Sequence, residues 1–255
     1  MNPPIKSGIG KFALTIFALF LATQFPACSK DTSNNPSAPL NNPSAPFRTF
    51  QTGFESINDF AGFYIVPQNH LNTASHDQSA ERVKSGGYAH KGWIYATNPP
   101  STPLINNNHR GYPTIQLYKT PGGGFKTPAL VEFWVSLDGK LSPGEWFSFA
   151  TLDHTTSDSW DAVLVNLSDK GFVHLMHVPR GGKAEYDFQT SALKFPLREW
   201  VKLTICIDFT PSGYTKVWQN DELVSVAKTG RGGRTADAGS FRSLRSTLVI
   251  KRRRV

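Results

Sequence analysis

A polar loop carries the densest set of chemically active groups in the chain. The segment Asn106-Asn107-Asn108-His109-Arg110-Gly111-Tyr112 combines amide, imidazole and guanidinium groups and directly precedes an alternating segment, Thr114 to Tyr118. A planar Arg fork beside Asn amides suits the binding of a carboxylate or sulfate group. The structural alternative stays open: the Asn residues would make turns and Arg110 would pair with a surface acid.

Polar and aromatic side chains also recur at every second position of three predicted strands. Side chains alternate between the two faces of a strand, so each strand has one apolar and one polar face. The inward set includes Ile115, Leu117, Val131, Phe133, Val135, Leu137 and Val217, and the polar faces hold Thr114, Gln116, Tyr118, Glu132, Trp134, Ser136, Tyr214, Lys216 and Trp218. If one sheet holds all three polar faces, they form a surface whose rings stack on sugars. The alternative is a set of solvent-facing positions, for Glu132 in particular.

Two histidines, His174 and His177, lie in the predicted strand Phe172 to Val178. Their spacing of three places them on opposite faces, which excludes a two-histidine metal pair from this segment. We assign His174 to substrate binding, with a core or outer-surface position as the alternative. Neither a zinc spacing nor a calcium loop is present, so no metal or other cofactor is predicted.

Two arrangements used by hydrolases are missing from the sequence. Retaining glycosidases need two carboxyl groups about 5.5 Å apart, and jelly-roll members place them on one strand as Glu-x-Asp-x-x-Glu. Here Glu132 stands alone beside Trp134, and no Gly-x-Ser-x-Gly segment occurs. The sequence therefore disfavours hydrolysis.

The elements that must position these residues are short β segments bounded by Gly, Pro, Asn and Asp. The predicted strands are Phe60 to Val66, Tyr88 to Tyr95, Thr114 to Tyr118, Leu130 to Leu137, Trp146 to Leu152, Trp160 to Leu167, Phe172 to Val178, Trp200 to Asp208, Thr215 to Gln219 and Leu223 to Val226. In the eighth strand Val201, Leu203, Ile205 and Ile207 point inward, and the last two strands form a hairpin that turns at Asn220-Asp221. The predicted fold is all-β, a two-sheet antiparallel jelly-roll sandwich.

The N-terminal region is typical of an exported protein. Lys6 and Lys11 form a basic region that precedes an apolar run, Phe12 to Ala22. This run is too short to span a bilayer comfortably. The pattern that ends at Cys28 resembles a bacterial lipobox and predicts lipidation of Cys28 and anchoring at the cell envelope, on an outer membrane. Cleavage by an ordinary signal peptidase and a plain membrane anchor remain alternatives. Residues 29 to 46 repeat Asn-Asn-Pro-Ser-Ala-Pro and predict an extended tether.

The net charge of +8 comes entirely from the C-terminal segment, Lys228 to Val255, where nine residues are basic and one is acidic. The rest of the chain, residues 1 to 227 with the predicted domain at residues 47 to 227, holds 18 basic and 18 acidic residues and is neutral overall, so nucleic acid is not a predicted partner. No final strand is apparent after Ala227. A truncated or frameshifted end and a disordered basic tail with an edge strand are the two interpretations. Because Cys28 lies in the leader, Cys206 is expected to form no intrachain disulfide.

Several sequence segments together resemble the polysaccharide lyases with a concanavalin A-like sandwich, the group of heparin lyase I and glucuronan lyase. The resemblance covers roughly Gln51 to Ala227. It is carried by Gly87 to Trp93, His109 to Gln116, Glu132-Phe133-Trp134, Phe195 to Trp200 and Tyr214-Thr215-Lys216. Other segments, such as Val217-Trp218-Gln219-Asn220, are common to lectin-like sandwiches.

The resemblance implies β-elimination at a uronic acid, a reaction that needs neutralisation of the carboxylate, a base and an acid. It implies that Arg110 and Gln116 neutralise the carboxylate, that His109 is a base or neutraliser, and that Tyr214 is a base or acid with Lys216 beside it. Tyr118, Glu132, Trp134, His174 and Trp218 would then bind the chain.

The predicted activity is thus cleavage of an acidic polysaccharide by a monomer. A non-catalytic glycan-binding lipoprotein is the main alternative, and a purely structural surface protein is the third.

Overall fold

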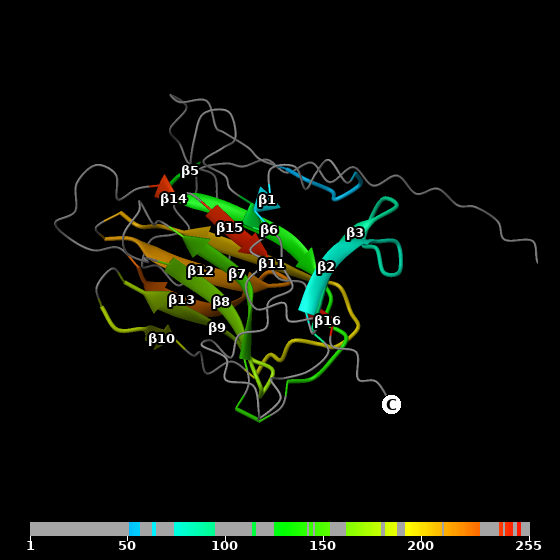
Figure 1. Cartoon of the computed structure of the whole chain (residues 1–255). Helices are drawn as coiled ribbons and strands as arrows, with labels where there is room; N and C mark the ends of the chain where they lie inside the picture. The colour runs from blue at the N-terminus through cyan, green and yellow to red at the C-terminus, as the bar shows by residue number, and fades with distance from the viewer. Residues whose placement is uncertain are drawn as a thin grey trace, which may run out of the picture.

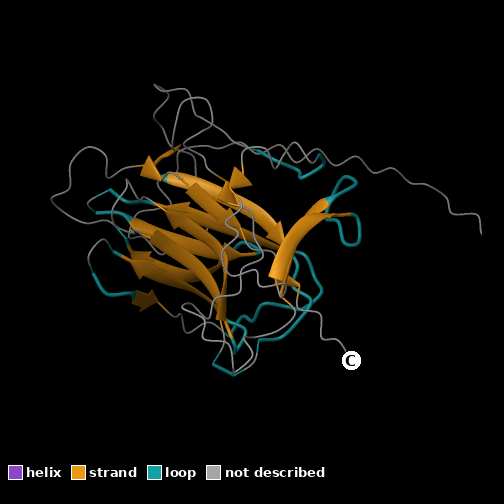
Figure 2. Ribbon diagram, in the orientation of Figure 1, coloured by secondary structure: helices purple, strands orange, loops and turns teal. Residues whose placement is uncertain are grey.

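The structure is a computed structural model. It describes residues 51–56, 63–64, 74–94, 114–115, 125–141, 143–144, 146–153, 162–179, 182–187, 192–210, 212–229, 240–241, 243–246 and 249–250. Within these ranges every regular element is a strand, as Figure 2 shows, and the predicted all-β class is confirmed. None of the described segments is a helix that could cross a membrane.

Two sheets form the body of the molecule (Figure 1). The seven-stranded sheet has the order β1 (Phe63–Tyr64), β4 (Thr114–Ile115), β15 (Ser243–Ser246), β7 (Trp146–Asp153), β8 (Ala162–Ser168), β9 (Val173–Val178) and β10 (Glu185–Asp187). The four-stranded sheet has the order β13 (Glu222–Lys228), β12 (Tyr214–Gln219), β11 (Val201–Ile207) and β6 (Ala129–Val135). All pairs within both sheets are antiparallel.

Two smaller sheets accompany this body. One pairs β2 (Ala74–Ser79) with β3 (Ala89–Ile94), to which β16 (Val249–Ile250) adds a parallel strand. The other pairs β5 (Phe125–Lys126) with β14 (Ser240–Phe241). Figure 1 places β2 and β3 beside the body, next to the end of β6.

The core lies between the two large sheets and follows the period-2 pattern. Every second residue of β11 is apolar and fully buried, and the alternating residues of β8 meet them from the other sheet. In β7 a bulge between Ser148 and Ala150 directs both Phe149 and Ala150 into the core. Phe149 there packs against Phe195, with ring centroids 4.8 Å apart. The predicted inward faces of β6 and β11 are confirmed.

The β12–β13 hairpin turns at Asn220-Asp221, as predicted. Both residues have positive φ, 47° and 70°, which is the backbone of a type I′ turn and is tolerated by Asn and Asp. The turn is also tied to the neighbouring strand, because the backbone N–H of Lys202 donates to the Asn220 side chain at 2.9 Å. This fixes the register of β11, β12 and β13.

The C-terminal segment differs from the prediction. Residues of β15 occupy an internal position of the seven-stranded sheet, pairing Leu244 and Arg245 with β4 on one side and with β7 on the other. The expectation that no strand returns after Ala227, or only an edge strand, is therefore wrong for these residues. The segment Ser-Leu-Arg-Ser was overlooked because it has a single apolar residue, Leu244, and a strand with partners on both sides gains its hydrogen bonds from the backbone.

Cys206 also differs from the prediction, because it forms a disulfide. It is the only cysteine in the described part of the chain, so its partner lies outside that part. The sequence holds one other cysteine, Cys28. The expectation of no disulfide assumed that the leader is removed or modified before Cys206 can react.

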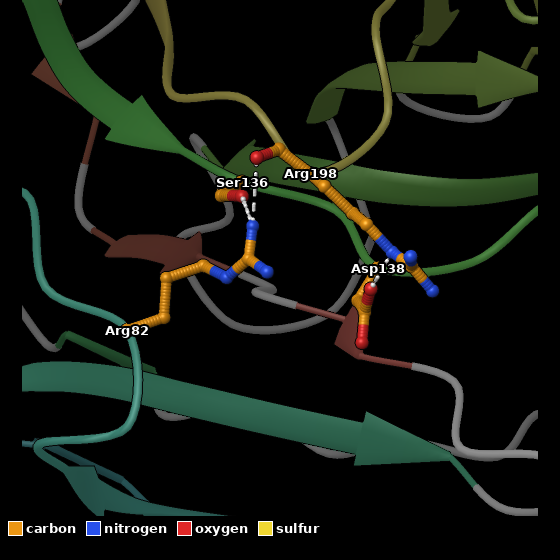
Figure 3. A network of polar contacts seen from close by, with 4 residues as sticks. All are labelled: Arg82, Ser136, Asp138 and Arg198. Carbon is orange, nitrogen blue, oxygen red and sulfur yellow. Dashed lines mark hydrogen bonds and ion pairs between the residues drawn. The ribbon is translucent and has the colours of Figure 1, made fainter.

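The loop between β2 and β3 is fixed to the end of β6 by Arg82 (Figure 3). One guanidinium nitrogen, Nη1, donates to Ser136 Oγ at 3.2 Å and to the carbonyl oxygen of Arg198 at 2.8 Å. Arg198 has a φ of 63°, and its own Nε donates to Asp138 Oδ1 at 2.7 Å. The network therefore joins three separate chain segments at one end of the four-stranded sheet.

The central packing can be tested by removing the Phe149 ring. Phe149→Ala leaves a cavity at the bulge, and we expect the free energy of unfolding to fall by about 3–5 kcal/mol in urea titrations followed by fluorescence. Tyr186→Ala is the control, because the Tyr186 ring is exposed and its removal should change stability by less than about 0.5 kcal/mol. Equal losses in the two variants would contradict this description of the core.

Candidate functional site

The face of the seven-stranded sheet that points away from the core carries polar and aromatic side chains, of which Asn166, His174 and Thr151 are buried and Trp146 and Tyr186 are exposed. Strand registers align its residues in cross-strand rows. The first row joins Trp146 to Ser168, the second joins Ser148, Asn166 and His174, and the third joins Thr151, Leu164, Met176 and Tyr186. The backbone positions of Thr114 and Arg245 extend the third row toward β4. We call this surface the His174 face.

The centre of the His174 face is a hydrogen-bonded cluster around Asn166. Ser148 Oγ donates to Asn166 Oδ1 at 2.5 Å, and Asn166 Nδ2 contacts Met176 Sδ at 3.9 Å. Both ends of the amide are thus held, and the amide cannot rotate without losing a contact. Asn166 and His174 are direct cross-strand partners, which places their Cβ atoms about 5 Å apart.

His174 is held as a neutral imidazole. Burial lowers the pKa of its ring below the ordinary value of 6.5, and a hydrogen bond to the backbone of Phe172 opposes this shift only in part. A neutral imidazole has one nitrogen that can accept a proton. At neutral pH, His174 is therefore in the state that a general base requires.

Two exposed rings flank the cluster. The Trp146 side chain is 52% exposed in the first row, and the Tyr186 side chain is 58% exposed in the third row. Three inter-strand spacings separate β7 from β10, about 14 Å, and the two rows are about 13 Å apart along the strands. An extended ligand that contacted both exposed rings would therefore cross the cluster.

The predicted site residues do not share one sheet. Thr114 and His174 belong to the seven-stranded sheet, whereas Glu132, Trp134, Tyr214, Lys216 and Trp218 belong to the four-stranded sheet. The outward faces of the two sheets point in opposite directions, because the core lies between the sheets. The hypothesis that all the polar faces line one surface is therefore wrong. Period-2 alternation distinguishes the inward side chains of a strand from the outward ones, but it does not determine the sheet to which the strand belongs.

Most of the predicted site residues on the four-stranded sheet are at least partly buried. Trp218 is 0% exposed and Lys216 is 1% exposed, and Trp218 packs with Cys206, Leu130 and Leu223. Glu132 accepts a hydrogen bond from Thr204 Oγ1 at 3.0 Å, and Tyr214 is half-buried beside Lys228. Among the described residues of the four-stranded sheet, Trp134, 38% exposed, is the one large exposed ring.

Other predicted residues lie outside the described part of the chain. They are Cys28, His109, Arg110, Gln116 and Tyr118. Thr114 and Ile115, which stand between Arg110 and Gln116 in the sequence, form β4 of the seven-stranded sheet.

Sequence reasoning missed the partners of His174. Asn166 lies in a run of apolar residues, Ala162 to Leu167, and Ser148 precedes a bulge that hides its alternation. A usable signal existed in β8: a single polar residue in an otherwise apolar strand must find a hydrogen-bond partner or face an open surface. The rings of Trp146 and Tyr186 had no comparable signal, since Trp146 begins its strand and Tyr186 lies in a strand of three residues that the sequence pattern did not predict.

Comparisons with known proteins support the fold. No protein-family model matches the sequence, and a search of curated proteins finds no match. Among solved structures, the cellulose induced protein Cip1 is similar with a TM-score of 0.50 and 12% identity, over 76% of this chain and 86% of that protein. An endo-β-1,4-glucuronan lyase from the fungus Trichoderma reesei is similar with a TM-score of 0.46 and 14% identity, over 70% and 76% of the two chains. At 12% identity the likeness to Cip1 concerns the β-sandwich fold.

The lowered pKa of His174 predicts a pH dependence of stability. Just below pH 6.5 the unfolded chain binds more protons than the folded one, so the free energy of unfolding decreases as the pH falls through this region. His174→Gln removes that titration. We expect urea titrations to show a smaller loss of stability between about pH 7.5 and about pH 5.5 in the variant than in the unaltered protein.

Other groups titrate equally in both proteins and cancel in this comparison. Burial raises the pKa of the Asp187 carboxyl, which acts in the opposite direction above pH 3.8 in the variant and the parent alike. Identical pH profiles for the two proteins would show that the His174 pKa is not lowered.

Proposed function

We propose that the protein cleaves a uronate-containing polysaccharide by β-elimination and that the His174 face is the site. The observation that carries this proposal is the placement of a neutral imidazole beside a fixed amide, on the sheet face that points away from the core. The exposed rings of Trp146 and Tyr186 support it, because aromatic rings stack on the C–H faces of sugars.

The reaction requires little more than this set of groups. A base removes the proton at C5 of the uronate, and the electron pair passes through an enolate stabilised by neutralisation of the C6 carboxylate. The bond from C4 to O4 then breaks, a C4=C5 double bond forms, and an acid returns a proton to the departing O4. No nucleophile and no pair of protein carboxylates takes part, in agreement with the absence of the Gly-x-Ser-x-Gly and Glu-x-Asp-x-x-Glu arrangements from the sequence.

We assign the base to His174 and hydrogen bonding of the uronate to Asn166. His174 is neutral at the working pH, and general base catalysis contributes typically 10²–10⁴-fold. Neutralisation of the carboxylate is proposed for Arg110 and Gln116, with His109 as a further donor, because these residues flank β4 in the sequence. Tyr214 and Lys216 lie on the other sheet from His174, so we give them no part in the reaction.

Capture of the polysaccharide without cleavage is the second candidate function. The exposed rings favour it, because stacking alone accounts for Trp146 and Tyr186. A protein of this kind would bind acidic chains with the same residues but produce no double bond. Absorbance of the C4=C5 bond in the ultraviolet therefore separates the two functions.

Replacement of the proposed base gives the direct test. With glucuronan, alginate and heparin as substrates, we expect absorbance from new double bonds with at least one of them. His174→Gln should lower kcat/KM by about 10²–10⁴-fold, because proton abstraction loses its acceptor.

His177→Gln is the matched control for that measurement. His177 lies on the same strand and is equally buried, but it faces the other way, so its replacement should affect stability without a comparable loss of turnover. Equal rates for His174→Gln and the parent would contradict the assignment, and binding of all three polymers without any absorbance would favour capture.

We also propose export to the cell envelope, with anchoring by a lipid on Cys28, from the leader pattern. The disulfide of Cys206 restricts this proposal. An intrachain partner of Cys206 has to be Cys28, the only other cysteine, and a lipid thioether uses the same sulfur atom. A chain can therefore carry the lipid or the intrachain disulfide, but not both.

Thiol labelling of denatured protein distinguishes the two forms. In membrane-bound, lipidated protein we expect Cys206 to react with a maleimide without prior reduction. In protein released without lipid, we expect labelling only after reduction. A lipidated monomer whose Cys206 resists labelling until reduction would contradict this exclusion.

A further inference from the structure

We propose a second glycan-binding surface, on the side of the sandwich opposite the His174 face, that takes an acidic polysaccharide without cleaving it. It is centred on Trp134 and includes Lys84, Arg82 and Lys202, and we call it the Trp134 surface. The identity of the polymer rests on the proposed function, but the binding itself does not require the elimination reaction.

The ring of Trp134 is the largest exposed apolar group on the four-stranded sheet. It lies on the outward face of β6, with Lys202 of β11 as its direct cross-strand partner. The ammonium group of Lys84 lies 4.0 Å from the ring centroid. An indole with a cation over one of its faces offers a uronate both parts of its chemistry, apolar ring surface outside the ammonium contact for the sugar C–H groups and a positive charge for the carboxylate.

The position of Lys84 is fixed rather than accidental. Lys84 belongs to the loop between β2 and β3, and Arg82 attaches this loop to Ser136 Oγ and to the carbonyl oxygen of Arg198 (Figure 3). Only one residue, Val83, therefore separates the anchor of the loop from the cation on the ring. A surface held in this way loses little conformational entropy when it binds a ligand.

The charges of the Trp134 surface favour an anion. Within the described part of the chain, neither Lys84 nor Arg82 forms an ion pair with a carboxylate. The contacts of Lys84 and Arg82 are to an aromatic ring and to uncharged oxygen atoms. Lys202 and Arg198 do pair, with Asp221 and Asp138. One cation without a counter-charge, Lys84, thus lies at the exposed ring, and a second, Arg82, lies in the same loop, an arrangement that an acidic chain complements.

The Trp134 surface is separate from the His174 face because the core lies between the two sheets. A single bound segment cannot touch both sides, so a sugar on Trp134 is out of reach of His174. Two surfaces on one protein raise the local concentration of a long polymer and leave the binding of a short oligosaccharide at the other face unchanged. The Trp134 surface should therefore strengthen the binding of a long polymer but not the binding of a short oligosaccharide at the His174 face.

Binding is best measured in a His174→Gln background, in which the proposed cleavage is slowed by about 10²–10⁴-fold. With alginate or glucuronan as the probe in affinity electrophoresis, we expect Trp134→Ala to weaken binding about tenfold through loss of the ring. Lys84→Gln should weaken binding by about two- to fivefold and should reduce the dependence on ionic strength. Hydroxyethylcellulose, a neutral polymer, should bind poorly to every variant.

Trp146→Ala is the matched control, since it removes an exposed Trp ring from the opposite face. In the active protein, turnover of a short uronate oligosaccharide should fall with Trp146→Ala but not with Trp134→Ala. Unchanged polymer binding in both Trp134→Ala and Lys84→Gln would overturn the proposal, as would equal binding of the neutral polymer. Trp134-dependent binding without any cleavage by the unaltered protein would support this surface while refuting the lyase.

Discussion

The shared core between the two sheets is the constraint on which the other features depend. Each of β6, β8 and β11 gives every second side chain to this core, and residues such as Val163, Leu203 and Ile205 are completely buried there. Burial of apolar surface at about 25 cal/mol per Å² is the main stabilising contribution in such a domain. The remaining half of the residues must lie on two outward faces that cannot meet. Chemistry carried by the outward residues of the described strands is therefore divided between opposite sides of the molecule.

The two outward faces use their polar residues differently. On the four-stranded sheet, Trp218 and Lys216 are buried, and Glu132 is bound to Thr204, so this part serves the fold. On the seven-stranded sheet, Asn166 and His174 are buried as well, yet both have groups suited to proton transfer or hydrogen bonding. Burial of an imidazole is costly if it is charged, and its pKa falls as a consequence. The same burial that reduces access thus sets the protonation state that a base needs.

Local patterns in the sequence were sufficient to predict most of the strands. The period of β11 and the Asn220-Asp221 turn follow from rules that involve neighbours in the sequence, and both are confirmed. The assignment of strands to sheets depends on contacts between distant segments, as for β4 and β6, and no local rule supplies it. β15 shows the same limit, because its two neighbours, β4 and β7, supply the hydrogen bonds that make Ser243–Ser246 a strand.

The candidate site was predictable only where one residue type carries its own chemistry. His174 was selected as a histidine that faces away from its neighbour His177, and the structure places the two on opposite faces. Asn166 was not selected, because its importance comes from a hydrogen bond with Ser148 and a register position opposite His174. Trp134 was selected as an aromatic ring on the polar face of its strand. The cation over that ring, Lys84, could not be predicted from the strand alone. A polar residue in this fold therefore gains its role from the strand beside it and from the loop that packs over it, and both are set by the pairing of segments far apart in the chain.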